Sequence, residues 1–277
     1  METSERREEI RERIEREGFV RLRDLSQSYG VSPVTIHRDL DFLVVTADVE
    51  RVRGGARSSV VGRHEIQNEY RLRRAEAARE KMAIAERAML EISDGSTIFL
   101  DSSTTALALA KRLELEPSRG LTLVTNSPAI AFQLHAPYIH VVVTPGELDQ
   151  SLRALTGRWT AEFLEGVSLN TAFVSAAGIH EKGGLMTTQR EVAEVTKALI
   201  PRSDRLVALV DSTKFDTGAF VTTAHRDELA AVITDDNLPT SVVERYRAAG
   251  YPIEVATPLL ARAESLARSP RPEGRHP

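Results

Sequence analysis

The chain has 277 residues, of which 42% are hydrophobic and 27% are charged. This is the composition of a folded globular protein, and it excludes collagen, a coiled coil and wholesale disorder. Cysteine is absent, which excludes disulfides, thiol nucleophiles and Cys-ligated zinc or iron–sulfur sites. The net charge of −4 identifies no class of partner. Residues 1–18 are charged without an apolar segment, and no apolar run approaches the ~18–20 residues of a membrane span, so we expect a cytoplasmic protein that contacts no membrane.

The first thirty residues carry the pattern of two short helices. Ile10 and Ile14 stand one helical turn apart among charged residues, which predicts an amphipathic helix over residues 5–17. Apolar residues at helical spacing predict a second short helix before Gly30. Gly18 and Gly30 mark the ends of these helices, because glycine adopts the left-handed conformation that often closes a helix.

A third helix is predicted to begin after Gly30. Ser32 is a suitable N-cap, and Pro33 fits the first helical position, where its missing N–H is not needed. The apolar face of this helix is formed by Ile36, Leu40 and Leu43. Two short helices joined at a glycine, the second with a polar N-terminal face, are a helix-turn-helix.

The third helix has the chemistry of a DNA recognition helix. Such a helix places its N-terminal residues against base edges in the major groove, and hydrogen-bond donors or small side chains are available there at Ser32, Thr35, His37 and Arg38. Residues 44–52 are β-prone and suit a β-wing whose arginines contact the DNA backbone or minor groove, namely Arg51, Arg53 and Arg57. Seven arginines stand against two glutamates over residues 51–74, which fits a polyanion partner. A helical hairpin that merely caps another domain is the alternative.

Residues 6–57 resemble the DeoR-type N-terminal domain of bacterial sugar-metabolism repressors. The family pattern Ser-x-x-Thr-Ile-Arg-Arg-Asp-Leu is matched by residues 32–40, SPVTIHRDL, and the wing pattern Arg-x-His-Gly-Gly-Ala by residues 51–56, RVRGGA. His37 replaces the first arginine of the pair, and Arg53 replaces the wing histidine. The resemblance implies binding to double-stranded operator DNA. At His37 it leaves open a changed base preference, pH-sensitive contacts, or a neutral donor to phosphate.

Beyond a small polar hinge at residues 58–62 and a helical pattern over 69–92, short apolar strands alternate with helices. Strands are predicted over 97–100, 121–124, 139–143, 171–174, 206–210, 231–233 and 252–255. Helices are predicted from the polar segment 101–105 to about 113, around 130–134, over 159–164 and 190–200, and around 241–249. This alternation is typical of a mainly parallel sheet with both faces covered. The last ten residues, RSPRPEGRHP, are predicted to be disordered because they cannot pack a core.

Polar loops follow the strands of this predicted sheet. Ligands of such sheets bind at the carboxyl ends of the strands, where the chain carries Asp101, Ser102, Ser103, Thr104, Thr105, Asn126, Ser127 and Lys214. Hydroxyls at a helix N-terminus favour an anion, and a lysine adds a cation. Each loop alone is an ordinary N-cap, but together they predict a cradle for a small phosphorylated compound. Neither the P-loop nor the dinucleotide-binding glycine motif is present.

Residues 79–236 resemble the DeoR C-terminal sensor domain, which is similar in fold to ribose-phosphate isomerases and glucosamine-phosphate deaminases. The resemblance rests on residues 99–105, 124–127, 146–148, 172–179, 184–185 and 211–215. It implies a phosphorylated sugar as effector and adds Gly178 to the effector-binding residues. Ala177 replaces a frequent aspartate, and Thr196 replaces a lysine, with Lys197 one residue further on. These departures leave room for an effector other than the common ones.

These patterns predict an α/β fold with a winged helix-turn-helix over residues 1–57, a linker over 58–78, an effector-sensing and oligomerisation domain over 79–260 and a disordered tail over 261–277. We expect a homo-oligomeric repressor, released from operator DNA by a phosphorylated sugar, without cofactor or metal. A phosphosugar isomerase with a DNA-binding appendage is the main alternative, although no acid or base is singled out. A DNA-binding architectural protein is the third possibility.

Overall fold

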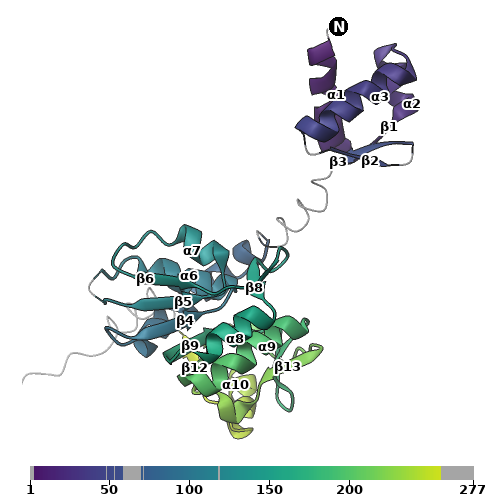
Figure 1. Cartoon of the computed structure of the whole chain (residues 1–277). Helices are drawn as coiled ribbons and strands as arrows, with labels where there is room; N and C mark the ends of the chain where they lie inside the picture. The colour runs from purple at the N-terminus through teal and green to yellow at the C-terminus, as the bar shows by residue number, and fades with distance from the viewer. Residues whose placement is uncertain are drawn as a thin grey trace, which may run out of the picture. The chain divides into compact units, whose positions relative to one another are not determined.

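Figure 1 shows the chain as a computed structural model. The structure describes residues 3–47, 49–52, 54–58, 70, 72–117 and 119–256. The chain divides into two compact units, residues 1–71 and 72–277, each with its own hydrophobic core. The predicted hinge beyond Ser58, most of the predicted linker and the predicted tail lie outside the described residues.

The N-terminal unit combines helices with a small antiparallel sheet. Its elements are α1 (Thr3–Glu17), β1 (Phe19–Arg21), α2 (Leu22–Tyr29), α3 (Pro33–Thr46), β2 (Val49–Val52) and β3 (Gly55–Ser58). The sheet has the order β1-β3-β2, and the hairpin β2–β3 is the wing (Figure 1). Apolar residues at helical spacing build the core, in which the fully buried side chains include Ile10, Ile14, Leu25, Ile36 and Leu40. The predicted winged helix-turn-helix is confirmed.

The helix ends of this unit follow from local sequence. Gly18 and Gly30 have φ angles of 74° and 64°, in the left-handed region that closes a helix. At the start of α3 the Ser32 hydroxyl oxygen accepts the N–H of Thr35 at 3.2 Å, and Pro33 occupies the first turn. These caps fix where α3 begins, and therefore which side chains lie in its first turns.

The predicted β-structure from Val44 onward is wrong at its start. Helix α3 continues to Thr46, and strand β2 begins only at Val49. β-Branched residues favour a strand by propensity, but Leu43 is buried in the core of the unit. Packing of the apolar helix face therefore outweighs the propensity. The Ala47 N–H closes the last turn on the Leu43 carbonyl oxygen at 2.8 Å.

The C-terminal unit is built on a parallel sheet. In spatial order its strands are β15 (Ile253–Ala256), β14 (Ala231–Asp235), β12 (Ser203–Leu209), β9 (Leu169–Val174), β4 (Thr97–Leu100), β5 (Thr122–Thr125) and β6 (His140–Val143). Each neighbouring pair is parallel. Every strand predicted from the sequence is present, displaced by three residues at most.

Helices cover both faces of the sheet (Figure 1). On one face α6 (Thr104–Leu113) packs against α5 (Ala78–Ala88) and α7 (Pro128–Gln133). On the other, α8 (Arg158–Glu165), α9 (Arg190–Leu199) and α10 (Thr240–Ala248) share a buried apolar cluster with the strands. The predicted α/β architecture is confirmed. Within the described ranges, no helix has the length and apolar character required to cross a bilayer.

Short elements that the sequence analysis did not anticipate accompany the sheet. β7 (Glu147–Asp149) pairs with β8 (Ala154–Thr156), and β10 (Gly178–His180), β11 (Gly184–Thr187) and β13 (Val221–Ala224) form a separate antiparallel sheet. Single 3₁₀ turns are η1 (Met89–Glu91), η2 (Ile200–Arg202), η3 (Ser212–Lys214) and η4 (Arg226–Glu228). Such strands of three or four residues are too short for periodicity to reveal them.

The helical pattern predicted over residues 69–92 is not one continuous helix. Residues 72–75 are helical, the chain turns at 76–77, and α5 begins at Ala78. Ala77 adopts a left-handed φ of 50°. The ammonium group of Lys81 donates to the carbonyl oxygens of Arg73 and Glu76, the latter at 2.5 Å. These bonds satisfy carbonyls at the end of the first helical segment and so stabilise the break.

The order of the strands reverses between β4 and β9. From β4 the chain adds β5 and β6 on one side, then crosses back to place β9, β12, β14 and β15 on the other. In open parallel sheets, ligands bind outside the carboxyl ends of the strands at such a switch point. The topology therefore directs attention to the loops that follow β4 and β9.

Candidate functional site

The first turns of α3 present a polar surface. Ser32, His37 and Arg38 are exposed and Thr35 is half-buried, whereas the opposite face of the helix lies in the core. The hydroxyl oxygens of Ser32 and Thr35 lie 2.9 Å apart, so the helix cap engages both. Arg38 forms no hydrogen bond or ion pair with the described residues. Its guanidinium is therefore available to a partner outside the chain.

His37 on α3 is in contact with the wing. The Nη2 atom of Arg51 in β2 lies 2.7 Å from His37 Nδ1, and Nη1 lies 2.7 Å from an oxygen of Asp41. Arg51 was selected from the sequence as a contact to the DNA backbone or minor groove. In the structure its guanidinium lies against the recognition helix instead of extending from the wing.

The other predicted wing arginines have different surroundings. Arg57 in β3 is exposed and forms an ion pair with Glu50 in the neighbouring strand β2. Arg53 lies outside the described residues, and its predicted role stays a prediction. The sequence analysis missed Arg21 and Arg23, which are exposed around the start of α2 and have no partner within the described part of the chain. The sequence feature that could have identified them is the positive charge at the start of the first helix of the helix-turn-helix.

In the C-terminal unit, Asp101 lies at the switch point. One carboxylate oxygen accepts the N–H of Ser103 at 2.9 Å, and the other accepts the N–H of Ser175, which follows β9, at 2.6 Å. Burial raises the pKa of the Asp101 carboxyl, and hydrogen bonds from the Ser103 side chain and from the N–H groups of Ser103 and Ser175 oppose the rise. Asp101 therefore joins the two loops of the switch point, and its carboxylate keeps capacity for a further donor.

The N-terminus of α6 offers backbone donors beside Asp101. The Ser103 hydroxyl caps the helix by accepting the N–H of Ala106 at 3.0 Å. The N–H groups of Ser102, Thr104 and Thr105 have no acceptor among the described residues. Free amides at the start of a helix, together with the helix dipole, make a favourable position for an anion.

The loop after β5 leaves the sheet next to the loop after β4, because Leu100 pairs with Thr125 in the parallel register. Ser127 caps α7 by accepting the N–H of Ile130 at 3.3 Å. Asn126 is only 4% exposed, and its side-chain amide donates to the Leu155 carbonyl oxygen at 3.0 Å. Its Oδ1 atom is buried and has no partner among the described residues.

Asn126 therefore carries an unsatisfied acceptor. Leaving such a buried acceptor unpaired costs about 1–3 kcal/mol. A ligand hydroxyl that donates to it would remove this penalty.

The loop after β12 contributes a carboxylate and a cation. Asp211 is buried and accepts the N–H of Thr213 at 3.1 Å, and Asp235 at the end of β14 accepts the N–H of Ser212 at 2.7 Å. Lys214 is half-buried and makes no hydrogen bond or ion pair with the residues described. Among these residues, no group of three or more His, Asp or Glu side chains is placed to hold a metal ion.

Lys81 is the residue of this site that sequence reasoning missed. It lies on α5 with 6% of its surface exposed, and it is close enough to Asp211 and Lys214 for all three charges to interact. Burial is the main cause that lowers the pKa of the Lys81 ammonium group, while Asp211 acts in the opposite direction. Helix α5 precedes the first strand of the sheet, so Lys81 does not lie in a loop that follows a strand. The rule that ligands bind in such loops therefore does not identify it.

Gly178 lies beside the loop that carries Lys214. Ile179 forms a parallel bridge with Phe215, and a side chain at Gly178 would collide with the carbonyl oxygen of Thr217. The glycine at position 178 is therefore required for close backbone approach.

On α9, Thr196 is buried and Lys197 is exposed. Lys197 therefore does not occupy the place of the lysine that Thr196 replaces.

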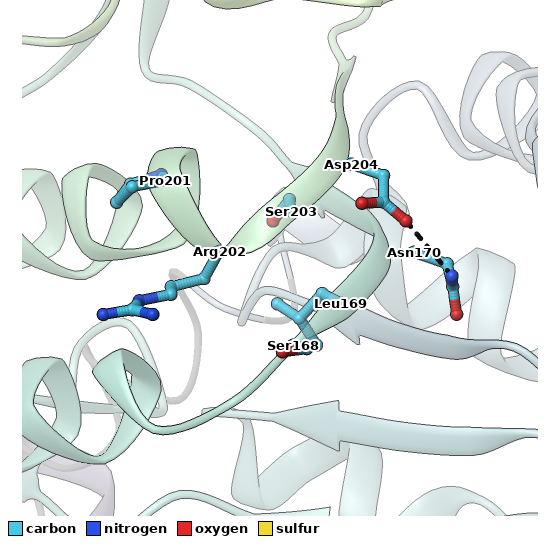
Figure 2. A pocket seen from close by; sticks show the side chains of 7 residues that line it. All are labelled: Ser168, Leu169, Asn170, Pro201, Arg202, Ser203 and Asp204. Atoms are coloured by element: carbon cyan, nitrogen blue, oxygen red, sulfur yellow. Dashed lines mark hydrogen bonds between the residues drawn. The ribbon is translucent and has the colours of Figure 1, made fainter.

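A cavity of about 330 Å³ lies at the opposite edge of the sheet (Figure 2). It is lined by the amino ends of β9 and β12, including Leu169, Asn170 and Ser203. The side-chain amide of Asn170 donates to Asp204 at 3.2 Å, and Figure 2 marks this hydrogen bond with a dashed line. Because this cavity is at the amino ends of the strands, it is separate from the loops of the switch point.

Two family models match the chain. Residues 6–60 match the DeoR-like helix-turn-helix domain, and residues 76–236 match the DeoR C terminal sensor domain. The two matches correspond to the two compact units and together cover most of the described residues. The alignments with sequence relatives also extend over both units.

Three relatives align over most of this chain and over most of their own length. The HTH-type transcriptional regulator GolR of Listeria innocua is 31% identical over 91% of this chain and 98% of its own length. The HTH-type transcriptional regulator GlpR of Haloferax volcanii is 29% identical over 90% and 96%. The Glycerol-3-phosphate regulon repressor of Escherichia coli is 29% identical over 88% and 95%.

Solved structures similar to this chain match about half of it. Ribose 5-phosphate isomerase A of Methanocaldococcus jannaschii aligns over 49% of this chain and 53% of its own, with 20% identity and a TM-score of 0.36. The delta subunit of eIF2B from Chaetomium thermophilum aligns over 55% and 54%, with 18% identity and a TM-score of 0.42.

Proposed function

Because the chain belongs to the DeoR family of transcriptional regulators, we propose that it represses a carbohydrate catabolic operon and is released from its operator when a phosphorylated sugar binds to the C-terminal unit. Membership of this family makes the chain a DNA-binding regulator and not an enzyme. The isomerase alternative is therefore set aside.

The proposed operator contact is the exposed face of α3 with the wing beside it. Thr35 and Arg38 lie in the first turns of the capped helix, which is the part of a recognition helix that meets base edges. Arg38 matches the donor geometry that guanine accepts. Arg57, Arg21 and Arg23 are exposed on the same unit and supply positive charge for phosphates. Since helix-turn-helix operators are read by two-fold dimers, we expect a homo-oligomer.

The observation that carries the effector proposal is the convergence of anion donors and cations at one edge of the sheet. The free amides at the start of α6 lie after β4, Lys214 lies after β12, and the buried Lys81 interacts electrostatically with Asp211 and with Lys214. Lys81 and Lys214 repel each other, Asp211 offsets part of their positive charge, and a bound phosphate would neutralise more of it. We propose that the phosphate binds among these groups, with charge-assisted bonds from Lys214 and Lys81.

The remaining polar groups suit the sugar hydroxyls. The unpaired Oδ1 atom of Asn126 and the free capacity of the Asp101 carboxylate are acceptors, so they select for hydroxyl donors. Relatives add support for a phosphorylated effector, because one of them is a repressor of the glycerol-3-phosphate regulon. The effector of this chain is therefore expected to carry both a phosphate and neighbouring hydroxyls.

Release from DNA requires that the sugar distinguish two arrangements of the chain. A ligand with equal affinity for the DNA-bound and DNA-free arrangements would change nothing, however tightly it bound. Coupling energies between two sites are typically about 1–3 kcal/mol, which corresponds to roughly a 5–150-fold change in operator affinity.

A thermal-shift screen of phosphorylated sugars, each paired with its unphosphorylated counterpart, tests the effector proposal. A true effector at about 100 times its Kd should raise the free energy of unfolding by about 2.7 kcal/mol. The unphosphorylated counterpart should have no comparable effect. Equal stabilisation by both members of each pair would contradict a phosphate-directed site.

A further inference from the structure

We propose that His37 is a specificity-determining residue of the operator-reading surface, because Arg51 fixes its ring so that a single N–H donor, on Nε2, faces the major groove and selects guanine. The inference rests on the proposed function, since it takes the first turns of α3 as the surface that meets DNA.

The contact between the two side chains determines which ring nitrogen carries the hydrogen. Arg51 Nη2 lies 2.7 Å from His37 Nδ1. A guanidinium group has only donors, so Nδ1 must be the acceptor in this bond. A neutral imidazole with an accepting Nδ1 carries its hydrogen on Nε2. The partner thus identifies the tautomer.

Arg51 is itself held in place. Its Nη1 atom donates to Asp41 at 2.7 Å and approaches the His37 carbonyl oxygen at 3.4 Å, so the guanidinium is held by two residues one turn apart on α3. Its Nε atom is buried without a partner among the described residues, and its side chain is only 28% exposed. Arg51 therefore orients His37 instead of standing free for a phosphate.

The donor that remains is directed away from the wing. The two nitrogens of an imidazole lie on different edges of the ring, so engagement of Nδ1 by Arg51 leaves Nε2 on the outer edge. His37 is exposed, and it lies within the first two turns after the Ser32 cap. Residues in this part of a recognition helix reach base edges. The surface offered at position 37 is one neutral N–H group.

A single donor reads DNA differently from an arginine. The edge of guanine presents two acceptors, N7 and O6, to which arginine binds with two bonds. The Nε2–H group of His37 makes one bond to either atom. Adenine offers one acceptor, N7, beside an amino donor, thymine offers one acceptor, O4, beside a methyl group, and cytosine offers a donor. Guanine is the favoured base because it alone presents two adjacent acceptors. One neutral hydrogen bond corresponds to a preference of roughly two- to tenfold.

The test begins with duplexes selected from a random pool by the full-length protein. Binding is then measured to a set in which every operator position carries each of the four bases. The wild type should prefer guanine by about two- to tenfold at one position of each half-site. His37→Ala and Arg51→Met should both remove this preference and leave the other positions unchanged, while His37→Gln, whose side-chain amide both donates and accepts, should shift the preference at this position toward adenine.

Arg57→Met is the matched control, because Arg57 is a wing arginine that pairs with Glu50 and not with α3. It should weaken binding to all duplexes and keep the guanine preference. A His37→Ala variant with every base preference intact would overturn the inference while leaving the proposed function standing. A wild type that shows no preference at any position would instead overturn the proposed function.

A spectroscopic measurement separates orientation of the ring from a general structural effect. Long-range ¹H–¹⁵N spectra of protein labelled at its seven histidines, assigned with His37→Ala, report the hydrogen on each ring nitrogen. His37 should show a protonated Nε2 and an accepting Nδ1, and Arg51→Met should produce a mixture of tautomers. A His37 ring with its hydrogen on Nδ1 in the wild type would overturn the inference.

Discussion

The Nε atom of Arg6 on α1 donates to Asp39 on α3 at 2.7 Å, and both side chains are at least nine-tenths buried. Arg7 donates to the other carboxylate oxygen at 2.8 Å. The carboxylate is thus paired on both oxygens, which is the condition under which a buried ion pair is tolerated. Because it joins the first helix to the recognition helix, this ion pair fixes the orientation of the surface proposed to meet DNA.

We predict that Asp39→Asn destabilises the N-terminal unit. The substitution leaves the buried Arg6 without its counter-charge, which costs about 3–5 kcal/mol when one partner of a buried pair is removed. The matched control is Asp41→Asn, two residues away on the same helix, whose carboxylate is 65% exposed and should contribute less than about 1 kcal/mol. Urea unfolding of the two full-length variants, followed by far-UV circular dichroism, checks the difference. Equal stability of the two variants would contradict this account of α3.

Two kinds of arginine should differ in their effect on DNA binding. Arg38→Ala should cost about 1–3 kcal/mol on the selected operator and reduce discrimination against mismatched sites. Arg57→Ala should weaken all duplexes alike and reduce the dependence of affinity on salt by about one phosphate contact. Fluorescence anisotropy at several salt concentrations, on specific and unrelated duplexes, separates these effects. A uniform loss of affinity in Arg38→Ala would assign that residue to the backbone.

Lys214→Met should weaken binding of the phosphorylated sugar found in the screen. Loss of a charge-assisted hydrogen bond costs about 1.5–3 kcal/mol, which is roughly a 10–150-fold increase in Kd. Lys197→Met is the control, because Lys197 is exposed on α9 and outside the proposed site. Isothermal titration calorimetry on the three proteins checks the prediction. Equal affinity of Lys214→Met and wild type would show that the pocket is assigned to the wrong residues.

The stability of the C-terminal unit should fall at high pH through Tyr246. This side chain is fully buried, and its hydroxyl donates to the Ile179 carbonyl oxygen at 2.9 Å. Burial raises the pKa of Tyr246 to about 12. The pKa in the folded protein lies above the ordinary value near 10. The contribution of the hydroxyl to the free energy of unfolding is therefore complete below about pH 10 and is lost as the pH rises toward 12.

The comparison of wild type with Tyr246→Phe isolates this contribution. The advantage of the wild type in free energy of unfolding should shrink by about 2–3 kcal/mol between pH 9 and 12. Denaturant unfolding at a series of pH values provides the measurement. A difference between the two proteins that stays constant over this range would contradict the raised pKa.

The parts of the fold that were predictable are those set by local sequence. Ser32, Gly18 and Gly30 mark helix ends because capping depends on a few neighbouring residues. The parallel sheet was predictable because strands buried on both faces are short apolar runs. The start of β2 was not, because propensity favours a strand at Val44 and only the burial of Leu43 in the folded unit keeps the helix intact.

The candidate sites were predictable in part, for a related reason. Loops after strands are found by a topological rule, and it located Asp101, Asn126 and Lys214 at one edge of the sheet. The rule does not identify Lys81, because α5 lies before the first strand of the sheet in the sequence and Lys81 is therefore not in a loop that follows a strand. Arg51 and His37 are fourteen positions apart in the sequence. Periodic patterns predict helices and strands, but they do not predict a contact between a side chain of the wing and one of α3.

Operator affinity with and without the selected phosphorylated sugar tests the central claim most directly. For the wild type at saturating sugar, the account predicts operator binding about 5–150-fold weaker than without it. The sugar concentration that gives half of this effect should be roughly 10–150-fold higher for Lys214→Met. The unphosphorylated sugar should leave both proteins bound. If the sugar binds to the wild type and its operator affinity stays the same, the C-terminal unit does not control DNA binding, and the account is contradicted.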